Sequence, residues 1–168
     1  DWIGTPPPLD PLPPPQPLGP ERVYLAHVPG AQQAIVTVLH PGPARTAHDW
    51  AATKLGAAIL GGGFSSRLNM LLRETKGVTY GAGGLFHYDR TASQFLATAN
   101  VRTDGVGETI RDIIREMAAL RTGDASGDEL WREKRGLVLS LADRSATSRA
   151  VLDSLREHAA HGLPWTEC

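Results

Sequence analysis

Two consecutive runs of alternating residues constrain the fold of this chain most strongly. The runs Val78–Tyr88 and Gln94–Arg102 each repeat an apolar or small side chain at every second position. Because successive side chains of a strand point to opposite faces, a period of two predicts half-buried strands. The polar stretch between the runs, residues 89–93, predicts a hairpin loop. In the first run, Tyr80 falls in phase with Ala82, so we expect Tyr80 to be half-buried on the same face.

Two more strands are expected nearer the N-terminus. The segments Arg22–Val28 and Gln32–His40 are rich in apolar and β-branched residues, and Pro29-Gly30 lies between them as a turn. Such runs bounded by turn residues are typical of strands.

The remaining periodic segments predict helices, because their apolar residues recur at helical spacing. The expected helices are Asp49–Leu60 after a capping-box variant at Thr46–Asp49, a segment from Ser65 or Ser66 to Lys76, Asp104–Arg121, a helix capped by Ser126–Glu129, and Thr147–His161. Strand pairs that adjoin helix pairs indicate an α+β fold with a mostly antiparallel sheet covered on one face by helices.

Proline divides the chain into two parts. Most of its prolines lie in residues 1–20, and proline disfavours both helices and central strands. We therefore expect residues 1–20 to be an extended linker, with an SH3-type proline ligand as the alternative. Residues 21–168 form the expected folded domain. The first residue is Asp rather than Met, which suggests a fragment or a processed product.

Composition excludes several classes of partner. The net charge of -1 gives no electrostatic footprint for nucleic acid or an anionic membrane. No apolar run approaches the roughly 18 residues that a membrane span needs. The single cysteine, Cys168, excludes an internal disulfide but identifies no compartment, so a bacterial periplasm and a cytoplasm both remain open.

The glycine-rich stretch Gly61–Gly63, followed by Phe64–Arg67, invites two enzymatic interpretations, and neither holds. A phosphate-binding P-loop needs the spacing G-x-x-x-x-G-K-[ST] after a strand, which is absent. A nucleophile elbow, G-x-S-x-G, would need glycine where Arg67 stands. We expect these glycines to serve a helix–helix turn and close packing.

Of the six histidines, only His158 and His161 lie close together in sequence. Their i, i+3 spacing with no glutamate between them does not fit the zinc-peptidase motifs H-E-x-x-H or H-x-x-E-H. We expect a solvated helix end there, and no zinc centre in this chain.

Arg73 and Tyr80 are the candidate site residues. Arg73 falls in the last turn of an expected helix, and Tyr80 lies in the following strand, across Gly77. A helix end and the strand that leaves it can bring two such side chains to one edge of a sheet. A guanidinium and a phenol there are both hydrogen-bond donors, as required to hold a peptide carbonyl or a developing oxyanion. An exposed arginine and a packing tyrosine without function remain the alternative.

The segment Leu60–Gly84 resembles the inactive domain of the insulinase/pitrilysin family of zinc metallopeptidases, which includes the mitochondrial processing peptidase and bacterial two-domain forms. The similarity rests on the glycine triplet, Ser66-Arg67-Leu68, Leu72-Arg73-Glu74, Lys76-Gly77 and Tyr80. Weaker similarity extends from about Val23 to Leu163.

The resemblance implies the non-catalytic, C-terminal, substrate-binding half of a zinc endopeptidase. In the family, two homologous half-domains face each other, and one carries zinc on an H-x-x-E-H helix. The other half supplies an arginine and a tyrosine to the substrate carbonyl, here Arg73 and Tyr80. We therefore expect zinc in a homologous partner domain or subunit, no cofactor in this chain, no activity by the chain alone, and peptides or unfolded polypeptides as substrates. A family-derived scaffold or interaction domain without a proteolytic role is the alternative. Family half-domains continue beyond Gly162–Pro164, so we also expect truncation at the C-terminus and an exposed sheet edge.

Overall fold

The computed structural model describes residue 4, residues 19–89 and residues 93–167. The expected linker at residues 1–20 therefore lies almost wholly outside the described residues. In chain order, the strands and longer helices are β1 (Gln33–Gly42), α1 (Trp50–Gly61), the π-helix η1 (Asn69–Thr75), β2 (Thr79–Tyr88), β3 (Ser93–Arg102), α2 (Val106–Arg121), α3 (Gly127–Leu139) and α4 (Ser148–His161). Short 3-10 turns lie at Thr103–Gly105, Ala142–Ser145 and Trp165–Glu167.

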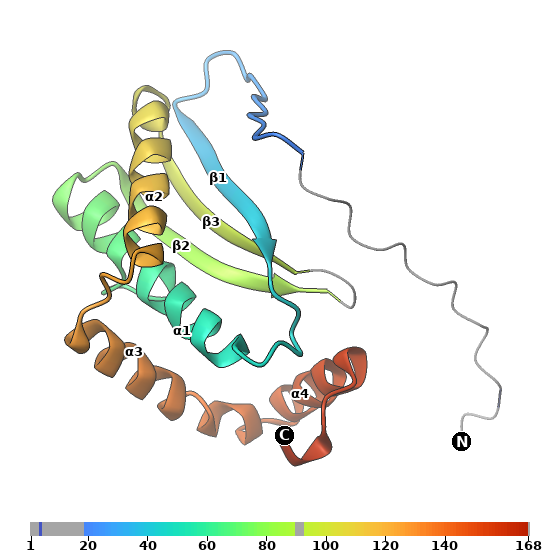
Figure 1. Ribbon diagram of the computed structural model, residues 1–168. Coiled ribbons are helices and arrows are strands. Elements are labelled where there is room, and N and C mark those ends of the chain that lie inside the picture. Colours follow the sequence, from blue (N-terminus) through green and yellow to red (C-terminus); the bar gives the residue numbers. More distant parts are fainter. Residues whose placement is uncertain (1–3, 5–18, 90–92, 168) are drawn as a thin grey trace.

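The three strands form one antiparallel sheet in the order β1-β3-β2. The hairpin partner β3 is therefore central, and both β1 and β2 have a free edge among the described residues. The helices α1, η1 and α2 pack against this sheet, and Figure 1 shows α1 and α2 together in front of the strands. The structure confirms the predicted α+β class, with an antiparallel sheet covered on one face.

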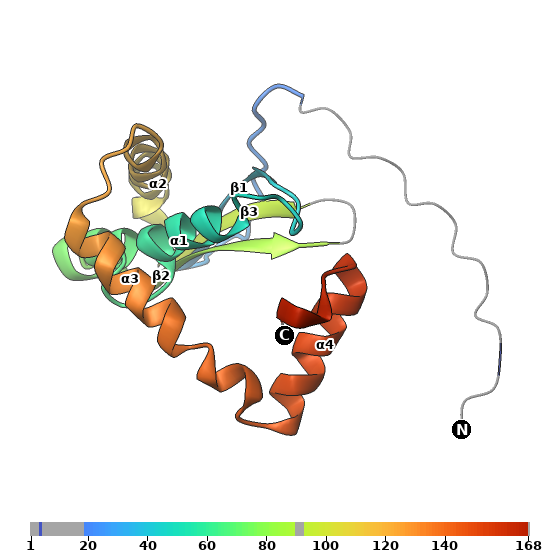
Figure 2. The ribbon, with the colours of Figure 1, turned by 60° about the horizontal axis from the view of Figure 1, so that its bottom comes forward.

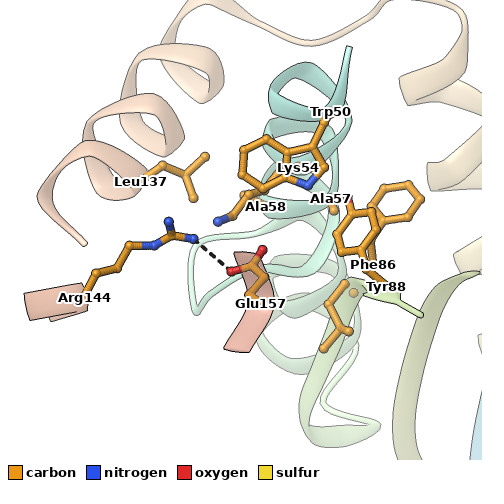
Figure 3. Close-up of a pocket in the computed structure, with 12 residues that line it drawn as sticks. Trp50, Lys54, Ala57, Ala58, Phe86, Tyr88, Leu137, Arg144 and Glu157 are labelled. Carbon is orange, nitrogen blue, oxygen red and sulfur yellow. Dashed lines mark hydrogen bonds and ion pairs between the residues drawn. The ribbon is translucent and has the colours of Figure 1, made fainter. Parts of the chain in front are cut away.

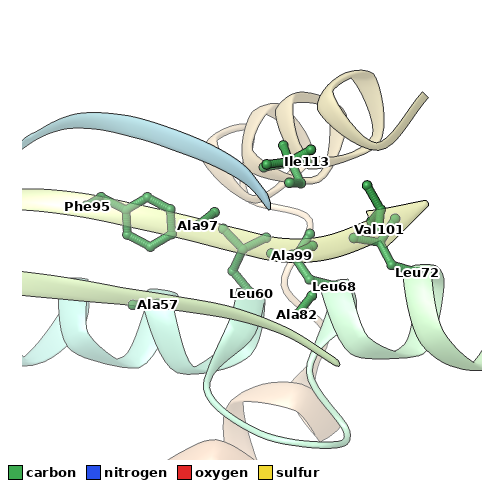
Figure 4. Packing of buried hydrophobic residues seen from close by; sticks show 11 residues of the cluster. Ala57, Leu60, Leu68, Leu72, Ala82, Phe95, Ala97, Ala99, Val101 and Ile113 are labelled. Atoms are coloured by element: carbon green, nitrogen blue, oxygen red, sulfur yellow. The ribbon is translucent and has the colours of Figure 1, made fainter. Parts of the chain in front are cut away.

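The alternation in β3 separates a covered face from an open one. The inward side chains are Phe95, Ala97, Ala99 and Val101, all of which are buried. They meet Leu60 of α1, Leu68 and Leu72 around η1, and Ile113 of α2 in one hydrophobic core (Figure 4). Apolar side chains on the open face of β1 stay in solvent, with Ile35 75% and Leu39 55% exposed.

Two predictions about local structure are wrong. The segment Arg22–Val28 is not a strand: it has no sheet partner, and Val23, Tyr24 and Leu25 are each more than 80% exposed. β-propensity alone does not form a strand, because a strand needs a neighbour for its main-chain groups. The expected capping box at Thr46–Asp49 is also absent, since Asp49 caps α1 without a side-chain hydrogen bond.

The helices α3 and α4 form an arm that extends away from the sheet and turns back on itself (Figure 2). The capping box predicted at Ser126 and Glu129 is confirmed, with both reciprocal hydrogen bonds present at the start of α3. Thr147 caps α4 by accepting from the backbone N–H of Ala150. No residue of α3 is buried, and the ion pairs Arg67–Glu129 and Arg45–Glu157 tie the arm to the rest of the molecule. In the part of the chain that the structure describes, every helix is too short or too polar to cross a bilayer.

Candidate functional site

The glycines before η1 let α1 lie directly against β2. A Cβ built on Gly61 would stand 2.2 Å from the backbone nitrogen of Gly84, whereas one on Gly63 would meet nothing within 4 Å. Only glycine fits at Gly61, because the obstacle is backbone rather than a flexible side chain. This close approach confirms the expected packing role for Gly61, whereas Gly63 has open space around it.

The segment that carries Arg73 is a π-helix rather than the α-helix expected from its leucine spacing. Leu68 and Leu72 are fully buried and fix the inner side of this segment against the core. The chain leaves it through Gly77, whose φ of +61° favours glycine. Single-turn π-helices are rare and occur frequently at functional sites.

Asn69 holds η1 to the start of β2. Its Nδ2 donates to the carbonyl of Ala82 at 2.6 Å and to that of Gly63 at 2.9 Å, while its Oδ1 accepts from the N–H of Ala82 at 2.9 Å. One amide side chain thus satisfies both main-chain groups of Ala82, as a neighbouring strand would. Asn69 itself is only 6% exposed.

Tyr80 lies in an irregularity of β2 that this anchor stabilises. The register shifts between Thr79 and Ala82, and the Thr79 hydroxyl both accepts from the N–H of Gly81 and donates to its carbonyl. An extra residue in a strand reverses the direction of the side chains that follow. Thr79 and Ala82 are consequently buried, and Tyr80 is 91% exposed. The prediction that Tyr80 shares a half-buried face with Ala82 is therefore wrong.

Arg73 is on the outer side of η1, and its side chain is 37% exposed. Its guanidinium lies 5.0 Å from the centre of the Phe64 ring, and its Nε is 3.4 Å from a carboxylate oxygen of Glu74. These contacts are partly solvated, so they hold the guanidinium loosely. No hydrogen bond or cation–π contact joins Arg73 to Tyr80, although η1 packs against β2.

Arg67 joins the first turn of this segment to the arm. Its guanidinium donates to both carboxylate oxygens of Glu129, at 2.7 and 2.8 Å, and to the carboxylate of Asp124 at 2.7 Å. The hydrogen bonds from Arg67 lower the pKa of Glu129 to about 2. Such a bidentate pair is geometrically specific, so it fixes the start of α3 beside η1.

Lys76 joins the other end of η1 to α2. Its ammonium group contacts Glu108 and lies 2.6 Å from a carboxylate oxygen of Asp112, which is only 2% exposed. Arg115 donates to the other oxygen of Asp112 at 2.8 Å. The hydrogen bonds to Asp112 and Glu108 raise the pKa of Lys76. Arg73 is thus carried by a segment tied at Arg67, Asn69 and Lys76 to three different elements.

The described residues do not form a metal centre. No group of three or more His, Cys, Asp or Glu side chains among them could hold a metal ion. His158, expected to be solvated, is in fact fully buried: its Nδ1 is 2.8 Å from the carbonyl of Ser154, and its ring stacks on Trp165. The residues present therefore do not fit a zinc site.

Comparison with known proteins identifies the family. Residues 1–137 match the family model of the peptidase M16 inactive domain. The chain belongs to this family. Membership confirms the resemblance to insulinase/pitrilysin peptidases seen at Leu60–Gly84. A comparison with curated protein sequences gives no significant match.

Solved structures agree with this assignment. The peptidase M16 inactive domain from Pseudomonas fluorescens is 27% identical, with a TM-score of 0.72 over 82% of this chain and 33% of that one. A protease from Helicobacter pylori is 21% identical, with a TM-score of 0.74 over 82% of this chain and 33% of its own. The inactive peptidase domain assigned to a zinc protease of Bordetella parapertussis is 21% identical, with a TM-score of 0.64 over 78% of this chain and 71% of that one. The Helicobacter and Bordetella structures, both 21% identical, show the fold alone. The present chain spans about a third of the length of the Pseudomonas and Helicobacter structures.

Sequence analysis of this M16 inactive domain missed the residues that position its candidate pair. Asn69 was assigned no role, while Arg67 and Lys76 were noted in the family motif without their ion-pair partners. Their partners lie as far as 62 residues away along the chain, in the case of Arg67 and Glu129. The one sequence signal for Asn69 was a polar residue between Leu68 and Leu71 in a helical apolar pattern.

Proposed function

We propose that this M16 inactive domain is the substrate-binding half of a zinc-dependent endopeptidase, in which Arg73 and Tyr80 donate hydrogen bonds to the carbonyl group of a bound peptide. The zinc belongs to a homologous domain or subunit, and the substrates are peptides or unfolded polypeptides. Family membership supports the peptidase-half assignment. The finer roles of Arg73 and Tyr80 are the proposal.

The exposure of Tyr80 is the observation that carries the proposal. A strand tyrosine kept for packing would be covered, yet Tyr80 is 91% exposed. The bulge that turns it outward is stabilised by two side chains, Thr79 and Asn69. Bulges often serve to re-aim a side chain. A bulge that holds the Tyr80 phenol in solvent therefore supports a role for Tyr80 in contacting another molecule or domain.

The chemistry of the pair suits a carbonyl oxygen. As a nucleophile adds to a peptide carbonyl, negative charge grows on its oxygen, and donors already in place stabilise this charge more than the ground state. Tyr80 offers one neutral O–H, and Arg73 offers a permanently charged fork of N–H groups. The loose contacts of Arg73 with Phe64 and Glu74 leave it available to a ligand.

The size of the related structures supports a larger assembly. This chain covers 33% of the Pseudomonas fluorescens structure, so about two thirds of that protein lies outside the matched domain. A second half-domain fits within that length. We place the zinc centre there because the described part of this chain has no ligand cluster for it.

The test is the turnover of a peptide substrate by the assembly of this chain with its zinc-bearing partner. Removing one oxyanion donor typically lowers kcat about 10²- to 10³-fold, so we expect a loss of that order for Arg73→Ala. Arg111→Ala is the matched control, because Arg111 is exposed on α2 and forms no ion pair with a described residue. Elemental analysis should give the same zinc content for both variants and no stoichiometric zinc in the isolated chain.

Full activity in the Arg73→Ala assembly would refute the assigned role. If the assembly lacked activity with every substrate while remaining stable and stoichiometric, the scaffold interpretation would replace the peptidase one.

A further inference from the structure

A cavity of about 350 Å³ lies between α1, the C-terminal end of β2 and the α3–α4 arm. This volume falls in the range of small-molecule sites. The β2 residues that line the cavity begin at Gly84, four residues beyond Tyr80 and roughly 13 Å along the strand at 3.3 Å per residue, and neither Arg73 nor Tyr80 lines it. The cavity is therefore separate from the proposed carbonyl-binding pair.

One wall of the cavity is aromatic. Trp50 of α1 and Phe86 and Tyr88 of β2 line it, and Figure 3 shows these rings on a different side from Arg144. Phe86 and Tyr88 stack with ring centres 5.9 Å apart, and Trp50 and Tyr88 are 6.5 Å apart. Such a wall favours an apolar group.

Positively charged side chains surround Glu157 at the same cavity: Lys54 and Arg144 line it, and Arg45 packs beside it on Trp50. Arg45, only 6% exposed, lies 3.6 Å over the Trp50 ring and donates to Glu157 at 2.7 Å. Arg144 approaches the other carboxylate oxygen of Glu157 at 3.5 Å. Burial alone would raise the pKa of Glu157, but the hydrogen bond from Arg45 and the nearby cations lower it. Glu157 is therefore ionised at neutral pH and already engaged.

Lys54 is the cation without a partner. It lines the same cavity, half-buried, with its Nζ 5.1 Å from the centre of the Trp50 ring, and it forms no ion pair with any described residue. Burial, and after it the charges of Arg144 and Arg45, lower the pKa of Lys54, while the charge of Glu157 raises it. The three cations Arg45, Lys54 and Arg144 around the carboxylate of Glu157 leave a net charge of +2. Two more acids, Asp143 and Asp153, lie with Arg144 and Glu157 around a neighbouring hollow, and Asp153 is engaged by Arg149 at 2.8 Å.

We infer that this cavity binds a carboxylate attached to an apolar body, with Lys54 and Arg144 facing the carboxylate and the aromatic wall holding the body. The C-terminal residue of a peptide and a small organic acid share this chemistry. A peptide terminus as the source rests on the proposed function, whereas the chemistry of the cavity does not.

The first test is an NMR titration of the ¹⁵N-labelled full chain with N-acetyl-L-phenylalanine and with its C-terminal amide. The acid should shift the Trp50 indole N–H and the amides of Ala57, Ala58 and Gly84, all on the cavity wall, and leave the Trp131 indole unchanged. We expect the amide to bind about tenfold more weakly, the usual scale for a lost charged hydrogen bond. Equal binding of acid and amide, or shifts confined to other surfaces, would overturn the inference.

Matched variants test whether the ammonium group of Lys54 binds the carboxylate of the ligand. Lys54→Met should weaken binding of the acid about tenfold and leave binding of the amide unchanged, while Lys54→Arg should retain both. Lys134→Met removes the same charge from the exposed surface of α3 and should change nothing. The spectra report directly whether each variant is folded. Unaltered acid binding by folded Lys54→Met would contradict the assignment.

A third comparison separates the two sources of the carboxylate. A peptide of roughly eight residues that ends in a free phenylalanine carboxylate should bind at least tenfold more tightly than N-acetyl-L-phenylalanine. Equal affinities would overturn the peptide source and leave a small-acid site. The Arg73→Ala variant should titrate like wild type, so failure of the cavity and failure of the proposed function give different results.

Discussion

Replacing Asn69 with alanine should both destabilise the protein and loosen the bulge that exposes Tyr80. In a strand, the N–H and C=O of one residue lie on the same side. Since Asn69 binds both groups of Ala82, these groups point away from β3 toward the free edge of β2. Asn69 takes the place of a fourth strand at that point, and it also blocks edge pairing there.

The magnitude follows from the groups left without partners. Gly63 keeps hydrogen bonds from Ser66, so the carbonyl and N–H of Ala82 are the groups that the Asn69→Ala change orphans. Each buried unsatisfied group costs about 1–3 kcal/mol, and water entering at the edge strand reduces this. We expect a loss of about 2–4 kcal/mol in the free energy of unfolding, or roughly 5–15 °C in Tm for a chain of this size.

Urea denaturation followed by circular dichroism measures this loss. Asn100→Ala, on an exposed position of β3, is the control and should change the free energy of unfolding by less than about 0.5 kcal/mol. If Asn69→Ala were as stable as Asn100→Ala, Asn69 would not be the anchor of the bulge, and the explanation for the exposure of Tyr80 would fail.

Two further predictions concern the surroundings of the site. Gly61→Ala should destabilise the protein by about 1–3 kcal/mol because its Cβ meets backbone, while Gly63→Ala should be near neutral in the same urea denaturation assay. Glu129→Gln should cost about 1–2 kcal/mol at pH 7, because the pair with Arg67 is lost. Since the folded pKa of Glu129 lies near 2, below its unfolded value, this stabilisation is present above about pH 4.5 and disappears as the pH falls toward 2. Asp128→Asn, on the same helix turn and exposed, is the control and should change the free energy of unfolding at pH 7 by less than about 0.5 kcal/mol.

The sequence predicted the parts of the fold that depend on local periodicity. The alternating runs became β2 and β3, and the capping box at Ser126 marks the start of α3 as expected. Both patterns carry their signal within a few neighbouring residues. Arg22–Val28 failed because a strand also needs a partner, and no sequence pattern in the segment reports whether one is present.

The candidate site was predicted only in outline. Arg73 and Tyr80 came from a family motif, but the environment of Tyr80 was wrong because period two ignores a bulge that Thr79 and Asn69 create together. Arg67 finds its partners 57 and 62 residues away, a pairing set by how α3 folds back on η1. Such tertiary contacts leave no local pattern in a single sequence.

The most direct test of the account is the kcat of the assembled peptidase carrying Tyr80→Phe, which removes one hydroxyl from an exposed side chain. Tyr24→Phe serves as the control, because Tyr24 is also exposed, at 83%. We predict a kcat about 10²-fold lower than wild type, with the zinc content unchanged and kcat of the control unaltered. A kcat equal to that of wild type would contradict the role of Tyr80 at the substrate carbonyl.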